Sequence, residues 1–381
     1  MFLVVLTSLL VWFVFLVARG QFWRANICLP DDYVQTKSAP SIVAIIPARN
    51  EEKYIGKALE SLVNQRYSGK FSIIVVDDQS SDGTVQVANA AAELNGHSEK
   101  VVVVNGKPLP PKWTGKMWAI KQGIDELSKY APDAVYVLLT DADIAHDCDN
   151  LSRLVSKAET ENIRLVSLMV RLRYKSSWEK LLVPAFIFYF QKLYPFSLVN
   201  RSGRKEAAAA GGCILVHRDT IASADIPMSI RTSLIDDCAL ARQVKESGAI
   251  WLGLAMDDTR SLRRYDQLSD FWSMVARSAF VQLNFSVVNL IGTVLGMLLL
   301  YMVPPIALMF GWLFDWKLSC LGGVTWCLMC ILYFPTLRYY NASIFWAPSI
   351  VLSGLMFTAM TVDSAFRYWL GQGNSWKGRS Y

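Results

Sequence analysis

Charged side chains are nearly absent from one long stretch of this 381-residue chain. Residues 285–366 contain only four of them, Asp315, Lys317, Arg338 and Asp363. This scarcity excludes a water-exposed domain here, because a surface that apolar requires lipid. The complete chain is 53% hydrophobic yet still 18% charged. The mixture predicts a soluble part joined to membrane-embedded parts.

Residues 1–18 also lack charge, and Arg19 and Arg24 follow them. No positively charged region precedes the apolar run and no small-residue cleavage site ends it, which argues against a cleaved signal peptide. We therefore expect a retained transmembrane anchor over residues 1–24. Since the arginines come after the span, the domain that follows is predicted to lie in the cytoplasm.

No disulfide framework is visible in the sequence. The seven cysteines are scattered and odd in number, which favours a reduced, cytosolic setting for the soluble part. Cys327 and Cys330 form a Cys-x-x-Cys pair, but the apolar run around them offers no other metal ligand. We expect a reduced pair buried in lipid rather than a zinc or redox site.

Several common motifs are missing as well. The formal charge of +6 is modest and fits anionic lipid headgroups at least as well as nucleic acid. No basic stripe with interleaved aromatic residues occurs, so no nucleic-acid partner is predicted. The chain also has neither the Gly-x4-Gly-Lys spacing of a P-loop nor a Gly-x-Gly-x-x-Gly after a strand.

Short apolar strands alternate with helical patterns after a polar linker at residues 25–40. This alternation predicts a doubly wound, mostly parallel α/β sheet covered on both faces, with its functional groups at the carboxyl ends of the strands. Strands are expected at 42–46, 71–76, 101–104, 135–140, 163–170, 212–216 and 250–255, and helices at 51–65, 84–94, 115–129, 149–160, 235–247 and 266–283.

Residues 181–199 are apolar and aromatic but include two prolines and Lys192. A true crossing would place residues 200–283 on the opposite side of the membrane from Asp143. We therefore predict an interfacial or re-entrant segment.

Three apolar runs follow, at 287–314, 318–336 and 344–362. The first contains Pro304-Pro305, and two interpretations are open: one kinked span or a tight hairpin. Three spans would place the basic tail, residues 367–381, outside, and four would return it to the cytoplasm.

Two pairs of aspartates each close a hydrophobic strand. Asp77-Asp78 ends one strand, and Asp141-x-Asp143 ends another. With no basic residue expected beside them, both pairs suit a divalent cation and the polar parts of a nucleotide. On an extended backbone Asp141 and Asp143 would point the same way and hold Mg2+ or Mn2+. The alternative for Asp143 is helix capping, and His146 nearby is expected at the surface.

Other polar segments have both a functional and a structural interpretation. Asn50 and Glu51, after Pro47-Ala-Arg49, can bind a base or ribose, or Asn50 can cap the next helix. Lys116, at a helix start, suits a phosphate oxygen. Asp236-Asp237 either complements a helix dipole or supplies a base that deprotonates a hydroxyl. Arg260, Arg263, Arg264 and Arg277 bind phosphates or face lipid headgroups.

Taken in order, these segments resemble family 2 glycosyltransferases of the GT-A fold over about residues 41–283. The resemblance implies a nucleotide-sugar donor, usually a UDP-sugar, a divalent metal, and inverting transfer by direct displacement. The motifs that carry it are Pro47-Ala-Arg-Asn-Glu51, Val76-Asp-Asp-x-Ser-x-Asp-Gly-Thr84, Asp141-x-Asp143, Gly211-Gly212 and Asp236-Asp237.

By this resemblance Asp78 binds uridine or ribose, Asp143 binds the metal, and Asp237 takes the acceptor proton. Asp236 and Arg277 join Asp237 in the catalytic group. The donor-binding group is completed by Pro47, Arg49, Asn50, Glu51, Asp77, Lys116 and Asp141.

Within the family the chain is most similar to membrane-bound hopene-associated and carotenoid-type glycosyltransferases. The segments responsible are 112–116, 263–265 and 376–379. Two departures are visible: the base motif, commonly Glu-Asp, is Asp236-Asp237, and of the Gln-x-x-Arg-Trp motif only Arg277 is present.

The resulting hypothesis is an integral membrane enzyme with a cytoplasmic catalytic domain at 41–283 and transmembrane helices within 284–366. It would transfer a sugar to a hydroxyl of a membrane lipid, of polyisoprenoid or triterpenoid type. Two alternatives remain open, a processive polysaccharide synthase and a catalytically silent scaffold of the same fold.

Overall fold

The computed structural model describes residues 1–30, 33, 39–94, 99–255, 259–372, 375–376 and 379–380. Parts of the expected linker and of the tail motif 376–379 therefore lie outside the described residues. The chain divides into two compact units, each discontinuous in sequence. One, the helical unit, comprises 1–26, 174–198 and 264–375, and the other, the sheet unit, comprises 27–173, 199–263 and 376–381.

The sheet unit contains a seven-stranded sheet in the order β3-β2-β1-β4-β7-β6-β8. Neighbouring strands are parallel except β7, which runs antiparallel to both β4 and β6. The prediction of a mostly parallel α/β sheet is thus confirmed. The strands are β1 (Ile42–Ala48), β2 (Phe71–Asp77), β3 (Val101–Asn105), β4 (Tyr136–Thr140), β6 (Leu165–Met169), β7 (Cys213–His217) and β8 (Ile250–Leu254).

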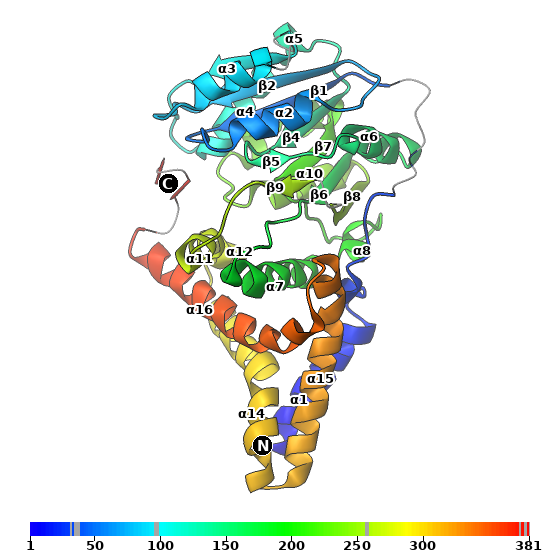
Figure 1. The fold of residues 1–381 in the computed structure, drawn as a ribbon, viewed down its shortest axis with the longest axis vertical. Helices are drawn as coiled ribbons and strands as arrows, with labels where there is room; N and C mark the ends of the chain where they lie inside the picture. The colour runs from blue at the N-terminus through cyan, green and yellow to red at the C-terminus, as the bar shows by residue number, and fades with distance from the viewer. Residues whose placement is uncertain are drawn as a thin grey trace. The chain divides into compact units, whose positions relative to one another are not determined.

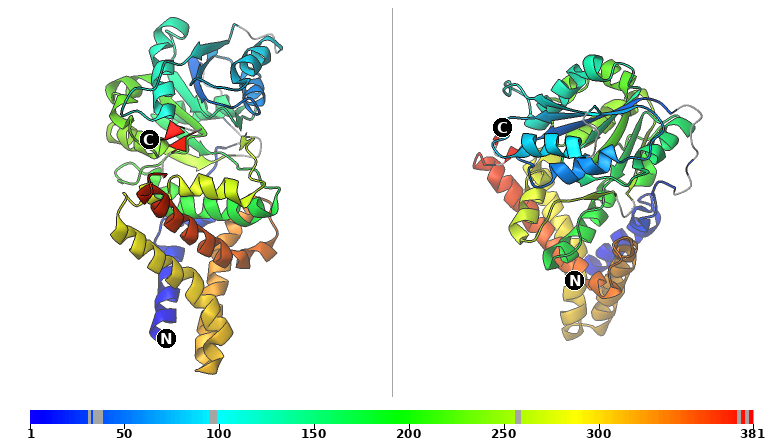
Figure 2. Two further views of the ribbon diagram at one scale, coloured as in Figure 1. Left: turned by 90° about the vertical axis from the view of Figure 1, so that its left-hand side faces the viewer. Right: turned by 45° about the horizontal axis from the view of Figure 1, so that its top comes forward.

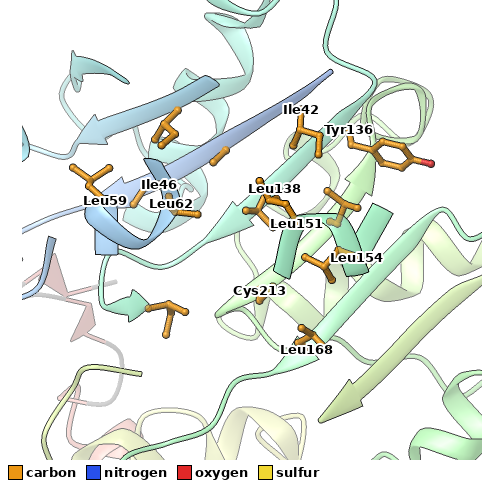
Figure 3. Packing of buried hydrophobic residues seen from close by; sticks show 14 of the residues in the cluster. Ile42, Ile46, Leu59, Leu62, Tyr136, Leu138, Leu151, Leu154, Leu168 and Cys213 are labelled. Carbon is orange, nitrogen blue, oxygen red and sulfur yellow. The ribbon is translucent and has the colours of Figure 1, made fainter. Parts of the chain in front are cut away.

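Helices cover both faces of this sheet (Figure 1). On one face, side chains of α2, α3 and α6 share a core with alternate residues of β1, β2, β4 and β6, shown in close-up in Figure 3. On the other face α4 approaches so closely that a Cβ at Gly123 would lie 2.5 Å from Ile45 Cγ2. The helices are α2 (Ile55–Val63), α3 (Thr84–Leu94), α4 (Gly115–Asp125), α5 (Leu127–Tyr130), α6 (Asn150–Thr160), α9 (Arg218–Ser223) and α10 (Asp236–Ser247).

The structure shifts several expected boundaries. Residues 51–54 form a loop, so the helix expected from residue 51 begins at Ile55. The expected helix 115–129 is interrupted at Glu126, and 266–283 forms two helices, α11 (Leu268–Ala276) and α12 (Ala279–Gln282). A small antiparallel pair, β5 (Ile144–Ala145) with β9 (Arg260–Ser261), was not expected. Two-residue strands are too short to leave a periodic pattern in the sequence.

Among the residues that the structure describes, four segments are long and apolar enough to cross a membrane, as judged by length and composition. Helix α1 (Phe2–Val17) is apolar but shorter. The four segments are Ser177–Val199, Val287–Leu313, Trp316–Tyr339 and Ile344–Trp369. Many of their large apolar side chains are exposed, as lipid-facing residues would be.

The run at 287–314 forms one helical segment rather than a hairpin. Helix α13 (Val287–Met297) continues through a π-helical turn at Leu298–Met302 into α14 (Val303–Phe310). The two prolines lie in the first turn of α14, where a missing backbone N–H is tolerated.

Helix α7 (Ser177–Leu193) runs across the bundle of α1, α14 and α15 (Trp316–Tyr339), not along it (Figures 1 and 2). Its N-terminus is fixed by a capping box between Ser176 and Glu179. Its buried aromatic residues pack edge-on against neighbouring helices, as Tyr189 does against Tyr301.

We expect Leu138→Ala, in the central strand β4, to lower the free energy of unfolding by about 2–5 kcal/mol, because it leaves a cavity in a close-packed core. Leu138 is fully buried, whereas Leu94 at the end of α3 is 87% exposed. Thermal unfolding of the detergent-solubilised protein, followed by circular dichroism, should separate Leu138→Ala from the matched control Leu94→Ala. Equal midpoints would contradict the assignment of this core.

Candidate active site

Charged side chains from three separate segments meet at Lys116, in the first turn of α4. Its Nζ lies 2.8 Å from Asp141 Oδ1, just after β4, and 3.4 Å from Asp236 Oδ2, at the start of α10. Burial alone would lower the pKa of Lys116, but the carboxylates of Asp141 and Asp236 outweigh it and hold the pKa above its usual range. Lys116 is therefore a fixed positive charge between acids. We call Lys116, Asp141, Asp236 and Asp237 the lysine cluster.

Asp237 is the most perturbed carboxylate of the lysine cluster. Burial, and then the charge of Asp236, raise its pKa to about 6, although Lys116 opposes the shift. Its Oδ2 accepts a hydrogen bond from the Gly211 N–H at 2.9 Å, and its Oδ1 accepts one from the Cys238 N–H at 2.7 Å. A carboxylate with this pKa is largely ionised at neutral pH and is a stronger base than an ordinary aspartate.

A small pocket opens beside these groups. Its lining includes Pro47, Lys116, Gly211 and Asp237, with apolar walls from α4 and from the segment before α10. A Cβ at Gly211 would lie 3.0 Å from Lys116 Nζ, so a side chain there would press on the lysine. The pocket thus places a carboxylate and an ammonium group beside an apolar surface. This combination suits a ligand that has both polar and apolar parts.

A second cluster lies around Arg263. Its Nε donates to Asp143 Oδ2 at 2.6 Å, and its Nη2 donates to both carboxylate oxygens of Glu51, at 2.9 and 3.1 Å. Asp143 and Glu51 are 8% and 7% exposed, so both ions are largely removed from water. The ring of Tyr54 lies 5.3 Å from the guanidinium and completes the group. We call Arg263, Asp143 and Glu51 the arginine cluster.

The donor set fits a divalent cation by charge. In the two clusters five carboxylates face two basic side chains, which leaves an excess of three negative charges when Asp237 is ionised. Carboxylate oxygens are the ligands that Mg2+ and Mn2+ prefer. Asp143 stays the predicted ligand of such an ion, although it now pairs with Arg263. Arg263 would have to release it.

Two of the remaining donor-group residues, Arg49 and Asn50, form hydrogen bonds between the loop after β1 and the loop after β2. Asn50 has a positive φ of 52°, its N–H donates to Ser80 Oγ, and its Oδ1 accepts from the Ser81 N–H at 2.8 Å. Arg49 Nη1 donates to the carbonyl oxygens of Asp78 and Gln79. The capping interpretation of Asn50 is wrong, because Tyr54 is the residue that precedes α2.

The two aspartates that close β2 are both buried. The carboxylate of Asp77, 7% exposed, accepts from the Ser80 N–H, and Asp78 is fully buried. In the parallel register Ala48 of β1 pairs with Asp77 of β2, so the loops after both strands meet at one edge of the sheet. This is the arrangement that the order of the strands predicted.

Four expectations about individual residues are wrong. Asp141 and Asp143 do have basic neighbours, because Lys116 and Arg263 reach them from distant parts of the chain. The backbone between them is a turn at 142–143, not an extended segment. His146 is 5% exposed and not at the surface. Arg277 is exposed at the junction of α11 and α12, not within a helix.

Arg277 belongs to the helical unit, and its catalytic role stays a prediction. Arg263 is one of the four arginines that the sequence left undecided between phosphates and lipid headgroups, and the structure pairs it with acids instead. Its distance of 120 residues from Asp143 explains why no local pattern indicated the pair.

A mostly parallel α/β sheet with acidic clusters at the carboxyl ends of β1, β2 and β4 is that of a GT-A glycosyltransferase fold. Residues 43–223 match the family model "Glycosyl transferase family 2". The chain therefore carries a glycosyl transferase family 2 domain.

Known proteins resemble parts of the chain. A probable glycosyltransferase, YdaM of Bacillus subtilis (strain 168), is 34% identical over 105 residues, 27% of this chain and 22% of that protein. A 4,4'-diaponeurosporenoate glycosyltransferase of Staphylococcus aureus (strain bovine RF122 / ET3-1) is 39% identical over 84 residues, 22% of this chain and 20% of that protein. The chain thus spans about a fifth of the length of these curated relatives.

A solved structure shares the fold over nearly the full length. The mannosyltransferase PcManGT from Pyrobaculum calidifontis, in complex with GDP-Man and Mn2+, superposes with a TM-score of 0.55. The match covers 96% of this chain and 99% of that chain at 16% identity, which shows a common fold.

Because Arg263 occupies the acids that a cation would use, we expect Arg263→Gln to bind Mn2+ about 5- to 10-fold more tightly than the unaltered protein. Electron paramagnetic resonance titration of Mn2+, without any sugar nucleotide, measures the affinity directly. The neighbouring Arg264→Gln is the matched control, since Arg264 pairs with Asp266 and is 63% exposed. Unchanged or weaker binding by Arg263→Gln would remove Arg263 from competition with the metal.

Proposed function

We propose that the protein transfers a sugar from a nucleotide-sugar donor, of UDP type, to a hydroxyl group of a membrane lipid, with inversion. The observation that carries this proposal is the position of Asp237 in the pocket, with a pKa of about 6, beside Lys116. A base poised near the working pH is what deprotonation of a hydroxyl nucleophile requires. The family 2 domain supports the reaction class.

In this proposal the residues of the site divide into a base, groups that bind the leaving diphosphate, and groups that bind the nucleoside. Asp237 accepts the proton of the acceptor hydroxyl as that oxygen attacks the anomeric carbon of the donor sugar. Lys116 keeps positive charge near the leaving diphosphate, and Asp141 and Asp236 hold its ammonium in place. Asp77, Asp78, Arg49 and Asn50 supply polar groups for the base and ribose. A divalent cation at Asp143, when bound, would neutralise the diphosphate charge.

The helical unit supports a lipid acceptor. A lipid with an apolar polyisoprenoid or triterpenoid tail can stay in the bilayer while its hydroxyl group remains near the interface. Helix α7, which runs across the bundle of α1, α14 and α15 (Figure 2), has the orientation expected of an interfacial segment. The staphylococcal relative is named as a 4,4'-diaponeurosporenoate glycosyltransferase, and an acceptor of that kind agrees with this proposal.

The proposal is tested by incubating the full-length protein with labelled sugar nucleotides, GDP-mannose among them, and a total lipid extract. We expect one labelled lipid carrying a single sugar, formation of which stops with EDTA and returns with Mn2+ or Mg2+. Asp237→Asn should lower kcat about 10²–10⁴-fold while the donor KM stays unchanged, because a positioned base acts in the transition state.

Three other outcomes would contradict the proposal, each in a different way. A polymeric product would identify a processive synthase, and absence of donor binding by calorimetry would indicate a silent scaffold. Near-normal turnover by Asp237→Asn would remove that residue as the base.

The reaction should also depend on pH in one direction. Since Asp237 acts in its ionised form, kcat/KM should fall about tenfold per pH unit below about 6 and level off above it. An ordinary aspartate would place this limb near pH 4. Initial rates between pH 4.5 and 8, with donor affinity measured at each pH as the control, locate the limb. A flat profile from pH 5 to 7 would contradict the role of Asp237.

A further inference from the structure

A buried hydrogen-bond network lies beneath the turn at residues 210–213, which is closed by the Cys213 N–H donating to the Ala210 carbonyl at 3.2 Å. Four polar side chains from separate elements form this network, and none is more than 5% exposed. They are Thr140 at the end of β4, His146 after β5, Asn150 at the start of α6 and Ser167 in β6. Burying that many polar groups is unfavourable unless every one is hydrogen-bonded.

One chain of hydrogen bonds runs from α6 to the turn. Asn150 Nδ2 can only donate, so His146 Nδ1, 3.0 Å away, accepts. Burial lowers the pKa of His146 to about 4, so the ring is neutral and its proton is on Nε2. Nε2 donates to Thr140 Oγ1 at 2.9 Å, and Thr140 Oγ1 donates to the Gly212 carbonyl at 2.8 Å. Every hydrogen along this path is fixed in direction.

The turn is held from two strands on its buried side. Thr140 of β4 fixes the carbonyl of Gly212, and Ser167 Oγ of β6 accepts from the Ala210 N–H at 2.9 Å. Between these two points lies Gly211, whose N–H donates to Asp237 Oδ2. The buried network therefore ends on one of the two backbone donors to the Asp237 carboxylate, and the other is the Cys238 N–H at the start of α10.

We propose that Thr140 and His146 are positioning residues, which fix the turn at 210–213 so that the Gly211 N–H holds Asp237 toward the acceptor hydroxyl. This rests on the function proposed above, in which Asp237 is the base. The network accounts for a buried histidine and a buried threonine that touch no substrate in that scheme. A turn that moves by a fraction of an ångström would rotate the carboxylate away from the proton that it takes.

The test is a double-mutant cycle in the full-length protein, assayed with the labelled donor and lipid extract. Thr140→Val keeps the shape of the side chain but removes the hydroxyl, and should lower kcat about 10- to 100-fold with the donor KM unchanged. Thr140→Ser restores the hydroxyl and should recover kcat to within about threefold. In the Asp237→Asn background Thr140→Val should cause no further loss, because its effect acts through Asp237.

Thr220→Val is the matched control, since Thr220 is an equally buried threonine in α9 (5% exposed). It should leave kcat unchanged even if it lowers the melting temperature. If Thr140→Val does not fold, His146→Leu, which removes both the Nε2–H donor to Thr140 and the Nδ1 acceptor of Asn150, is put through the same cycle. Additive losses with Asp237→Asn, or equal losses in Thr140→Val and Thr140→Ser, would overturn the positioning role. Failure of the proposed function is seen separately, as no transfer by the unaltered protein.

Discussion

The site depends on one interaction, the contact of Lys116 with Asp141 and Asp236. Parallel strands place their carboxyl ends at one edge of the sheet, and this chain ends its strands in acids. Carboxylates gathered there and shielded from water would repel one another or take up protons. Lys116 supplies the compensating charge from α4, and Asp236 and Asp141 keep its ammonium ionised in return. Neither partner would be stable in this position alone.

Arg263 likewise compensates the buried negative charges of Asp143 and Glu51, but with a different geometry. Its planar guanidinium reaches two carboxylates at once, whereas the lysine acts as a point charge. The two clusters nevertheless keep an excess of acid. That imbalance makes the site electrostatically incomplete. A donor diphosphate with its cation would therefore alter the charge balance in both clusters.

A small residue and buried polar groups determine how the carboxylate of Asp237 is oriented. Gly211 has room for no side chain beside Lys116, and its N–H is committed to Asp237. On the buried side of the turn at 210–213, Thr140 and His146 form a chain of hydrogen bonds at positions where apolar side chains would be usual in a core. A fully apolar core would pack as well but would not fix the direction in which the Gly211 N–H points.

The sequence determined the elements and their order. Short apolar runs predicted the strands, and the position of acids after 71–76 and 135–140 correctly predicted where polar groups collect. This worked because strand ends, apolar periodicity and scarcity of charge are local properties. The same local information left Asn50 ambiguous between capping and loop contacts. It could not reveal that β7 runs antiparallel, since an apolar run carries no direction.

Only the tertiary structure decided which charges meet. Lys116 and Asp141 are 25 residues apart, and Arg263 and Asp143 are 120 apart, so their pairing follows from sheet order and not from spacing. The burial of His146 has the same origin, because it depends on what α6 and β4 place around it. Local pattern determines what each segment is, and the packing of distant segments determines which charged groups meet and how the pKa values of Lys116 and Asp237 are shifted.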